Sequence, residues 1–286
     1  MNIAIVGVGL MGGSFALSLK DNSIAKKIIG VDSNSENSSR ALELGIVDEV
    51  VAFEDIASRE DIDLIVITIP VNAIPTVAIK LLNKVRSNQI IMDMGSTKSE
   101  LCEMISEHRN RNRFVATHPM WGTEKHGPEA AVHGAFSGRV TVICEESVTD
   151  KDAVEAVEQI YTKIGMRVTY MDAEQHDLHA AYVSHISHIT SYALALTVLE
   201  KERSEDKILD LSGAGFETTV RLAKSSPSMW TPIFMQNKYN VLDVLREHIH
   251  QLQVIRKMIE KDDFEGLNNC IVKANTIEKI LSRKKQ

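Results

Sequence analysis

A glycine-rich turn near the N-terminus constrains the fold more than any other feature of the chain. The apolar run 3–6 leads into Gly7, Gly9 and Gly12, and a helical pattern follows from residue 10. The first glycine permits a tight turn, the second lets the backbone approach a pyrophosphate, and the third lets the helix lie close to the strand. N–H groups and positive dipole at the start of the helix attract phosphate. The turn predicts a dinucleotide-binding unit, although a turn that binds nothing has the same local pattern.

An acidic residue indicates which dinucleotide binds. Asp32 ends a second apolar run, 28–32, and follows Gly12 by 20 residues (32 − 12). A carboxylate at this point accepts both hydroxyls of the adenosine ribose and repels a 2′-phosphate. Residues 33–35 supply no Arg or Lys, and we expect Arg40 to be solvated on the next helix. NAD is therefore favoured over NADP, with contacts expected from Gly7, Gly9, Leu10, Met11, Gly12, Asp32 and Ser33.

Composition narrows the class of protein. The 286 residues are 44% apolar and 25% charged, which is typical of a globular chain long enough for two domains. The net charge of −7 argues against a nucleic-acid partner. No apolar run reaches the roughly 20 residues of a membrane span, and no basic region precedes the first apolar run, so we expect neither membrane nor signal peptide. The widely spaced Cys102, Cys144 and Cys270 are interpreted as reduced thiols of a cytoplasmic protein.

The first half of the chain alternates strand and helix patterns. Strands are expected at 2–6, 28–32, 47–52, 62–69, 89–94, 113–117, 139–144 and 166–170, and helices at 10–20, 36–44, 72–86, 98–109 and 150–163. Such alternation predicts a parallel sheet covered on both faces. The fold class is therefore α/β, with a doubly wound, Rossmann-type NAD-binding domain over 1–172.

The second half reads as helical. Long helices are expected at about 173–200, 236–261 and 264–283, with turn and cap signals at 213–215 and 226–228 between them. Long helices cannot bury both faces within one chain of this length. We therefore expect residues 173–286 to form a helical substrate and dimerisation domain that packs on the first domain and on a second copy.

Two polar segments follow consecutive strands, where a doubly wound sheet places its second substrate. The first contains Ser96 and Lys98, and the second, 117–127, contains His118 and Trp121. Residues of these types at the end of a strand are more typical of a functional site than of a packed core. Structural roles remain open for all three residues. Ser96 could be a helix N-cap, His118 could be hydrogen-bonded to loop backbone, and Trp121 could pack the loop against the core.

Further polar candidates lie in the helical half. His185 and His188 are three residues apart and share a helical face, which suits polar contacts at the cleft, substrate or, less readily, a metal ion. No third metal ligand has helical spacing on that turn, so no metal is expected. Arg221 is either a bidentate partner for a substrate carboxylate or an exposed member of a weak surface pair.

Taken together, these motifs resemble those of the prephenate dehydrogenase family, the oxidoreductases of tyrosine biosynthesis. The resemblance spans nearly the whole chain. Its motifs are Gly7-Val-Gly-Leu-Met-Gly-Gly-Ser14, Asp93-x-Gly-Ser96-x-Lys98, His118-Pro-Met-x-Gly-Thr-Glu124, His176-Asp177, Ser184-His-x-x-His188 and Gly215-Phe with Arg221 and Trp230. The family fold is a dinucleotide domain followed by a helical dimerisation domain. It agrees with the two domains predicted for residues 1–172 and 173–286.

The resemblance implies a reaction and a role for each motif. The reaction is NAD-dependent oxidative decarboxylation of prephenate to 4-hydroxyphenylpyruvate. The catalytic residues would be His118, which accepts the proton of the ring hydroxyl, Ser96, which bonds the same hydroxyl or orients His118, and His188, which positions substrate. The substrate-binding residues would be Arg221, Thr123, Glu124, Trp230, His176 and Asp177.

Two departures from the family pattern bear on the substrate. Glu217-Thr218 stand where many relatives have Lys-Asp, and Trp121 replaces a common small residue. The extra anion leaves arogenate open as the substrate. Another NAD(P)-dependent oxidation of a hydroxy acid or imine is the other enzymatic alternative, and a non-catalytic NAD-binding protein is the third. The chain ends without room for a C-terminal regulatory domain, so feedback through such a domain is not expected.

Overall fold

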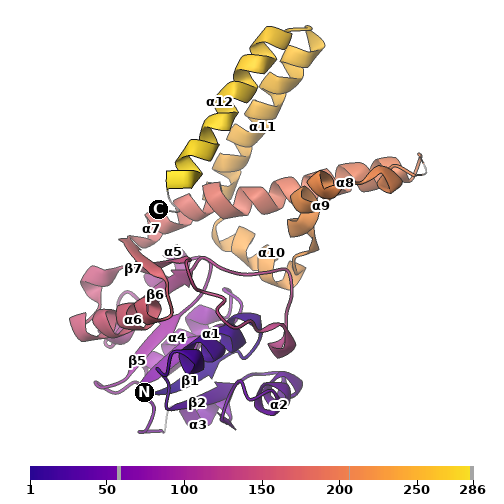
Figure 1. Cartoon of the computed structure of the whole chain (residues 1–286). Coiled ribbons are helices and arrows are strands. Elements are labelled where there is room, and N and C mark those ends of the chain that lie inside the picture. Colours follow the sequence, from indigo (N-terminus) through magenta and orange to yellow (C-terminus); the bar gives the residue numbers. More distant parts are fainter. Residues whose placement is uncertain (57–58, 206, 284–286) are drawn as a thin grey trace. The chain divides into compact units, whose positions relative to one another are not determined.

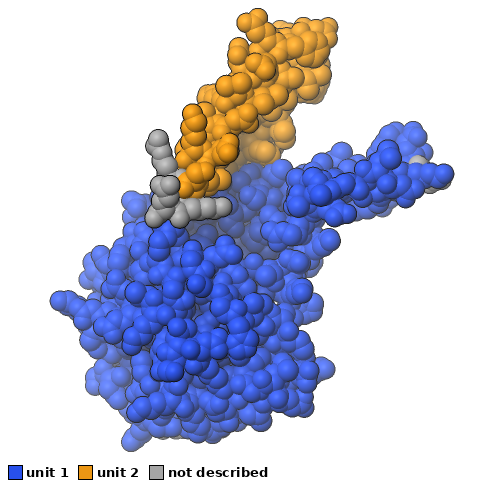
Figure 2. Space-filling view, viewed as in Figure 1, with its two compact units in different colours: residues 1–238 blue, residues 239–286 orange. Residues whose placement is uncertain are grey.

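The protein is described by a computed structural model that covers residues 1–56, 59–205 and 207–283. It forms two compact units, residues 1–238 and 239–286, which are coloured separately in Figure 2. The first unit contains the sheet, the helices that cover it and the first part of the helical half. The second contains nearly all of two long helices.

The described residues of the first unit form an eight-stranded sheet (Figure 1). Its order is β3-β2-β1-β4-β5-β6-β7-β8, and the first six strands run parallel. β7 is antiparallel to β6, and β8 is parallel to β7. The strands are β1 (Asn2–Val6), β2 (Lys27–Val31), β3 (Glu49–Val50), β4 (Leu64–Ile67), β5 (Ile90–Asp93), β6 (Phe114–Pro119), β7 (Val140–Cys144) and β8 (Arg167–Met171). This order is that of a doubly wound dinucleotide-binding sheet, so the predicted fold class is confirmed.

Helices cover both faces of this sheet because its central strands are apolar on both sides. Along β1, Ile3 and Ile5 pack with α1, α2 and α6, whereas Ala4 and Val6 pack with α3, α4 and α5 on the opposite face. These helices are α1 (Leu10–Asp21), α2 (Ser35–Glu43), α3 (Phe53–Ile56), α4 (Ile74–Leu82), α5 (Ser99–Ile105) and α6 (Lys151–Lys163).

The long helix expected at about 173–200 is present as one continuous segment, but it is not α-helical throughout. α7 (Ala173–Ala180) continues through a π-helical turn, η4 (Ala181–His185), into α8 (Ile186–Glu202). α9 (Ala214–Val220) and the short 3-10 turn η6 (Arg221–Lys224) pack along α8. α10 (Pro227–Gln236) begins with Pro227 at its first position, as the cap signal predicts, but the pattern did not reveal the helix itself.

The second unit consists chiefly of α11 (Lys238–Glu260) and α12 (Phe264–Arg283). Both expected helices are present, and a turn at 261–263 joins them. Among the described residues, no helix is both long enough and apolar enough to traverse a lipid bilayer.

Parallel strands bring their carboxyl ends to one edge of the sheet. The glycine turn follows β1, Asp32 follows β2, the segment 93–98 follows β5, and His118 lies near the end of β6. Segments that lie far apart in the sequence therefore share one edge, which is where a doubly wound sheet binds its ligands.

Candidate active site

The glycine turn has the shape that a dinucleotide requires. Gly7 has φ of +100°, and a Cβ there would lie 2.8 Å from the carbonyl oxygen of Thr68. A Cβ at Gly12 would lie 2.0 Å from the carbonyl oxygen of Gly7, so only glycine lets α1 approach β1 this closely. A Cβ at Gly9 would meet nothing within 4 Å. Two glycines therefore serve packing, and Gly9 faces open space where a pyrophosphate can approach.

The start of α1 is suited to bind that pyrophosphate. Gly9 is the N-cap of α1 and supplies no side-chain cap, and the first turn carries no acidic residue. The first N–H groups of a helix need partners, and the helix dipole favours an anion there. Leu10 and Met11 form the first turn beside this opening.

Asp32 is held at the end of β2 in a half-buried position. Its Oδ2 accepts the Val8 N–H at 3.0 Å, and its Oδ1 accepts the Asn34 N–H at 2.9 Å. A carboxylate offers about four lone-pair sites, so acceptor capacity remains for ribose hydroxyls. Ser33 lies exposed beside it.

The nearest cation on the following helix is already paired. Arg40 donates to Glu43 and to Glu129 at 2.9 Å each. Arg40 was expected to be solvated on α2, and its side chain is 43% exposed. Its charge is balanced within the protein, and the Asp32 carboxylate repels a 2′-phosphate, so the pocket fits NAD.

A fully buried ion pair anchors the segment that follows β5. The Lys98 ammonium donates to Asp93 Oδ2, and both side chains are 0% exposed. Asp93 also accepts the Gly95 N–H at 2.8 Å and the Thr117 N–H at 3.2 Å. Because Thr117 directly precedes His118, the pair ties the loop that carries Ser96 to the strand that carries His118.

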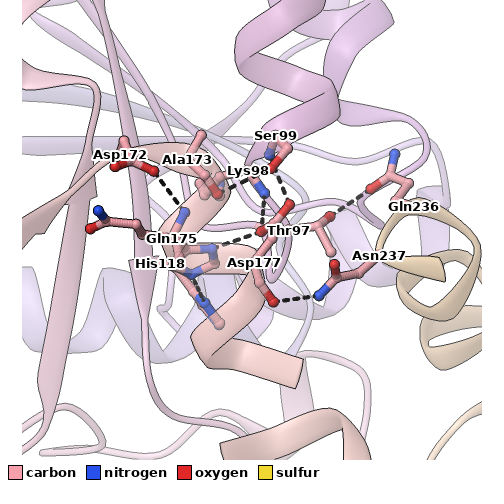
Figure 3. A network of polar contacts seen from close by, with 12 residues as sticks. Thr97, Lys98, Ser99, His118, Asp172, Ala173, Gln175, Asp177, Gln236 and Asn237 are labelled. Carbon is pink, nitrogen blue, oxygen red and sulfur yellow. Dashed lines mark hydrogen bonds and ion pairs between the residues drawn. The ribbon is translucent and has the colours of Figure 1, made fainter. Parts of the chain in front are cut away.

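Ser96 is half-buried on this loop and does not cap the next helix. α5 begins at Ser99, its N-cap is Lys98, and no side chain of the cap position bonds the helix. Asp177 takes that role from α7: its Oδ1 accepts the Lys98 N–H at 2.8 Å and its Oδ2 the Ser99 N–H at 2.9 Å. Asp177 and the two residues whose N–H groups it accepts are labelled in Figure 3.

His118 is bonded to a second histidine rather than to loop backbone. It is 8% exposed, and its Nδ1 lies 2.8 Å from Nε2 of His176. Burial, and after it the positive charge of Lys98, hold the pKa of His118 well below its usual value. Its imidazole is therefore neutral near pH 7, the form that accepts a proton.

His176 and Asp177 stand behind His118 instead of lining open space. Both are 2% exposed, and His176 Nδ1 lies 2.8 Å from Asp177 Oδ1. Burial alone would raise the pKa of Asp177, but hydrogen bonds from His176, Ser99 and Lys98 outweigh it, and the pKa is lowered. These two residues, expected to bind substrate, have protein partners at the polar atoms named here, and Figure 3 labels Asp177 among its partners.

A second cluster forms around the π-helical turn. The His188 ring stacks on Trp230 of α10, with centroids 3.4 Å apart and planes 26° from parallel. Its Nδ1 lies 3.2 Å from the carbonyl oxygen of Ser184, which can only accept, so Nδ1 carries a proton and Nε2 is left for a ligand. Burial, opposed by that hydrogen bond and aided by the charge of Arg221, lowers the pKa of His188.

Arg221 lies within reach of the loop that follows β6. Its Nη1 is 3.3 Å from Glu124 Oε2, and the two side chains are 53% and 30% exposed. Thr123, half-buried beside Glu124, accepts the Lys125 N–H at 3.2 Å within the same loop. Trp121 packs on Phe136 with ring centroids 5.3 Å apart, as expected for a residue that closes the loop onto the core.

Several residues of the site have no recognisable motif in the sequence. Asn237 donates to the carbonyl oxygen of Asp177 at 2.6 Å and lies 3.2 Å from Nδ1 of His185. Thr97 donates to Gln236 at 2.6 Å (Figure 3). Both contacts come from the end of α10, whose position depends on tertiary packing. The only local signal was the Ser-Pro cap that starts this helix.

The sequence matches two models of one protein family over most of its length. The family model described as "Prephenate dehydrogenase, nucleotide-binding domain" matches residues 15–170, and "Prephenate dehydrogenase, dimerization domain" matches 172–273. Prephenate dehydrogenase of Bacillus subtilis is 32% identical over 267 residues, which cover 93% of this chain and 72% of the relative. Cyclohexadienyl dehydrogenase of Zymomonas mobilis is 30% identical over 267 residues, which cover 93% and 91%.

A solved structure agrees with these relationships. The structure of prephenate dehydrogenase from A. aeolicus in complex with hydroxyphenyl propionate and NAD+ superposes with a TM-score of 0.89 at 33% identity, covering 98% of this chain and 97% of that one. The two family models together account for most of the sequence, and the fold and the dinucleotide turn agree with them. The chain belongs to the prephenate dehydrogenase family and is an NAD-dependent oxidoreductase.

Proposed function

We propose that this protein oxidatively decarboxylates prephenate to 4-hydroxyphenylpyruvate with NAD as oxidant. The observation that carries the proposal is the neutral, buried His118 at the carboxyl edge of the sheet, hydrogen-bonded through Nδ1 to His176. The other ring nitrogen, Nε2, has no hydrogen-bond partner among residues 1–56, 59–205 and 207–283. Oxidising a ring alcohol requires a base at this edge.

The cofactor residues follow from the turn and from Asp32. NAD, when bound, supplies the acceptor for the hydride. The N–H groups at the start of α1 would bind its pyrophosphate, and the Asp32 carboxylate would accept the adenosine ribose hydroxyls. The proposed contacts are Gly7, Gly9, Leu10, Met11, Gly12, Asp32 and Ser33.

The residues of the site account for the proton. As hydride leaves the ring carbon that bears the hydroxyl, His118 Nε2 accepts the hydroxyl proton and the C–O bond becomes a carbonyl. The bond from the ring to its carboxylate then breaks, carbon dioxide departs, and the electron pair makes the ring aromatic with a phenolate oxygen. His118 returns the proton to that oxygen. The balance is prephenate plus oxidised NAD giving 4-hydroxyphenylpyruvate, carbon dioxide and reduced NAD.

The remaining residues would bind and orient the substrate. Arg221 has five N–H donors, of which Glu124 engages one nitrogen, so the guanidinium can still pair with a carboxylate. Ser96 would bond the ring hydroxyl beside His118, and His188 would position the ring from its place on Trp230. Thr123 and Glu124 would line the pocket.

Arogenate is the second candidate substrate. The observation in its favour is the ion pair between Arg221 and Glu124. Arogenate carries an ammonium and a carboxylate on the same side-chain carbon. A guanidinium and a carboxylate 3.3 Å apart present the complementary pair of charges. Glu217, exposed on α9, adds a second anion on the segment that leads to Arg221.

We also propose a cytoplasmic homodimer assembled through residues 173–286, with the domain boundary after residue 172. The match to a dimerization-domain model supports the assembly. Exposed apolar side chains on the two helices of the second unit support it as well, since monomers rarely expose so many. They include Leu252, Ile259, Phe264, Ile271, Val272, Ile277, Ile280 and Leu281. The free cysteines fit a reducing compartment.

Steady-state kinetics with both substrates tests the proposal. The purified protein is incubated with NAD and either prephenate or arogenate, and NADH is followed by absorbance. We expect NADH from prephenate, with 4-hydroxyphenylpyruvate as product. A larger kcat/KM for arogenate would select the second candidate. Absence of NADH with both substrates would overturn the proposal.

A further inference from the structure

We propose that His176 and Asp177 set the tautomer of His118, so that its lone pair lies on Nε2 and faces the substrate. The proposal rests on the proposed function, because it assigns His118 as the base. It makes His176 and Asp177 positioning residues rather than substrate ligands.

Asp177 is a fixed acceptor. Each carboxylate oxygen accepts one backbone N–H at the start of α5, at 2.8 Å from Lys98 and 2.9 Å from Ser99. The Asn237 side chain donates a hydrogen bond to the backbone carbonyl oxygen of Asp177 at 2.6 Å (Figure 3). Asp172 caps α7, the helix that carries Asp177, by accepting the Gln175 N–H at 2.7 Å. A carboxylate bound by N–H donors stays ionised and can only accept hydrogen bonds.

His176 therefore carries its proton on Nδ1. That nitrogen lies 2.8 Å from Asp177 Oδ1, which has no proton to give. A neutral imidazole with a protonated Nδ1 has its lone pair on Nε2. Nε2 of His176 is thus an acceptor, and it lies 2.8 Å from Nδ1 of His118.

The tautomer of His118 follows directly. Because His176 Nε2 accepts, Nδ1 of His118 must donate, and the lone pair of the neutral His118 ring lies on Nε2. The opposite arrangement requires a doubly protonated His176 and a His118 with its proton on Nε2. That arrangement would add a buried cation to a site that already encloses the Lys98 ammonium, and it would leave no base for the hydroxyl proton.

The same chain of hydrogen bonds acts during turnover. When Nε2 of His118 accepts the hydroxyl proton, the ring becomes a cation and its Nδ1–H still points at His176. The positive charge is then stabilised through His176 by the Asp177 carboxylate, as a carboxylate stabilises the imidazolium of a hydrolase triad. Loss of this support should lower kcat and leave KM nearly unchanged, because neither residue is assigned a contact with substrate.

Nitrogen NMR of the full-length wild-type protein reads the tautomer without any substrate. With ¹⁵N-labelled histidine, the signals of His118 are assigned as those that vanish in the His118→Asn variant. We expect a protonated Nδ1 and an unprotonated Nε2 for His118, and a protonated Nδ1 for His176. If the neutral His118 ring carries its proton on Nε2, the inference is overturned.

Kinetics of Asp177→Asn supply the second test, with Asp172→Asn as the matched control. Asparagine caps a helix as well as aspartate does, so the control keeps the position of α7 and should keep wild-type kcat. We expect Asp177→Asn to lower kcat by about 10²–10⁴-fold. The KM values for NAD and for prephenate should stay within about threefold of those of the wild-type enzyme. A kcat equal to that of the control would refute the inference. A wild-type enzyme without turnover would instead refute the proposed function, whatever tautomer the spectrum shows.

Discussion

Single residues at this site owe their chemistry to neighbours that are remote in sequence. His118 is neutral because it is buried and because the Lys98 ammonium opposes a further positive charge. Its base strength is therefore modest, and its advantage is position. A neutral imidazole held at the sheet edge can take and return one proton without any change elsewhere in the site.

Replacing His118 tests this residue directly. His118→Asn keeps a hydrogen-bonding side chain of similar size but cannot accept a proton. We expect kcat to fall by about 10²–10⁴-fold while the affinity for NAD, measured by calorimetry, persists. His179→Asn, an exposed position on α7, is the control. An unchanged kcat in His118→Asn would remove His118 as the base.

Arg221 makes a different contribution, because its side chain is 53% exposed. Charged hydrogen bonds contribute about 1.5–3 kcal/mol, which corresponds to about 10–100-fold in binding. Arg221→Ala should raise KM for the substrate by that factor and change kcat less. Arg203→Ala, an exposed arginine near the end of α8, should leave KM unchanged. Equal KM values for the two variants would show that Arg221 does not hold the carboxylate.

At the scale of elements, the ion pair between Lys98 and Asp93 joins the loop after β5 to β6. Both groups are fully buried, so removal of one leaves an uncompensated charge in the core. We expect Lys98→Met to lower the free energy of unfolding by about 3–5 kcal/mol, measured by urea denaturation.

Lys20→Met is the matched control for that measurement. Lys20 pairs with Asp48, but these side chains are 30% and 40% exposed. Its loss should cost about 1 kcal/mol or less. If the two variants unfold at the same urea concentration, the buried pair does not stabilise the site as described.

Elements with a local signature could be predicted from the sequence, and the others could not. Short apolar and β-rich runs located every strand among the described residues, and the glycines located the dinucleotide turn with Asp32. The π-helical turn and the antiparallel direction of β7 have no local pattern. α10 was missed because its sequence contains Pro232 and begins within the turn signal at 226–228.

The candidate site divides in the same way. His118, Ser96 and Arg221 stand in recognisable motifs, so they could be named in advance. The contact between His118 and His176 joins residues 58 positions apart, and the cap that Asp177 places on α5 joins residues 78 and 79 positions apart. Such contacts depend on how helices pack on the sheet, which no short motif encodes.

For the whole molecule, buried histidines make stability depend on pH. The pKa values of His118 and His188 are lowered, and that of His185 is lowered to about 4, chiefly by burial. The unfolded chain binds these protons near pH 6.5, whereas the folded protein does not. The contribution of these histidines to the free energy of unfolding is therefore complete above about pH 6.5. It decreases as the pH falls toward their folded pKa values.

Urea unfolding at about pH 7.5 and about pH 5, at one protein concentration, measures this dependence. His185 alone accounts for about 2 kcal/mol between these two pH values, because each of the roughly 1.5 pH units between 6.5 and 5 contributes 1.36 kcal/mol. His185→Gln should flatten the dependence, and His179→Gln, at an exposed position, should not. Equal stability of the wild-type protein at both pH values would contradict the burial of neutral histidines.

A structure of the enzyme with NAD and a 4-hydroxyphenyl carboxylic acid tests the central claim most directly. The distance to measure joins Nε2 of His118 to the ring hydroxyl oxygen. We predict about 2.6–3.2 Å, with the nicotinamide across the ring and the ligand carboxylate on Arg221. A hydroxyl bound elsewhere, with His118 out of reach of it, would contradict the account.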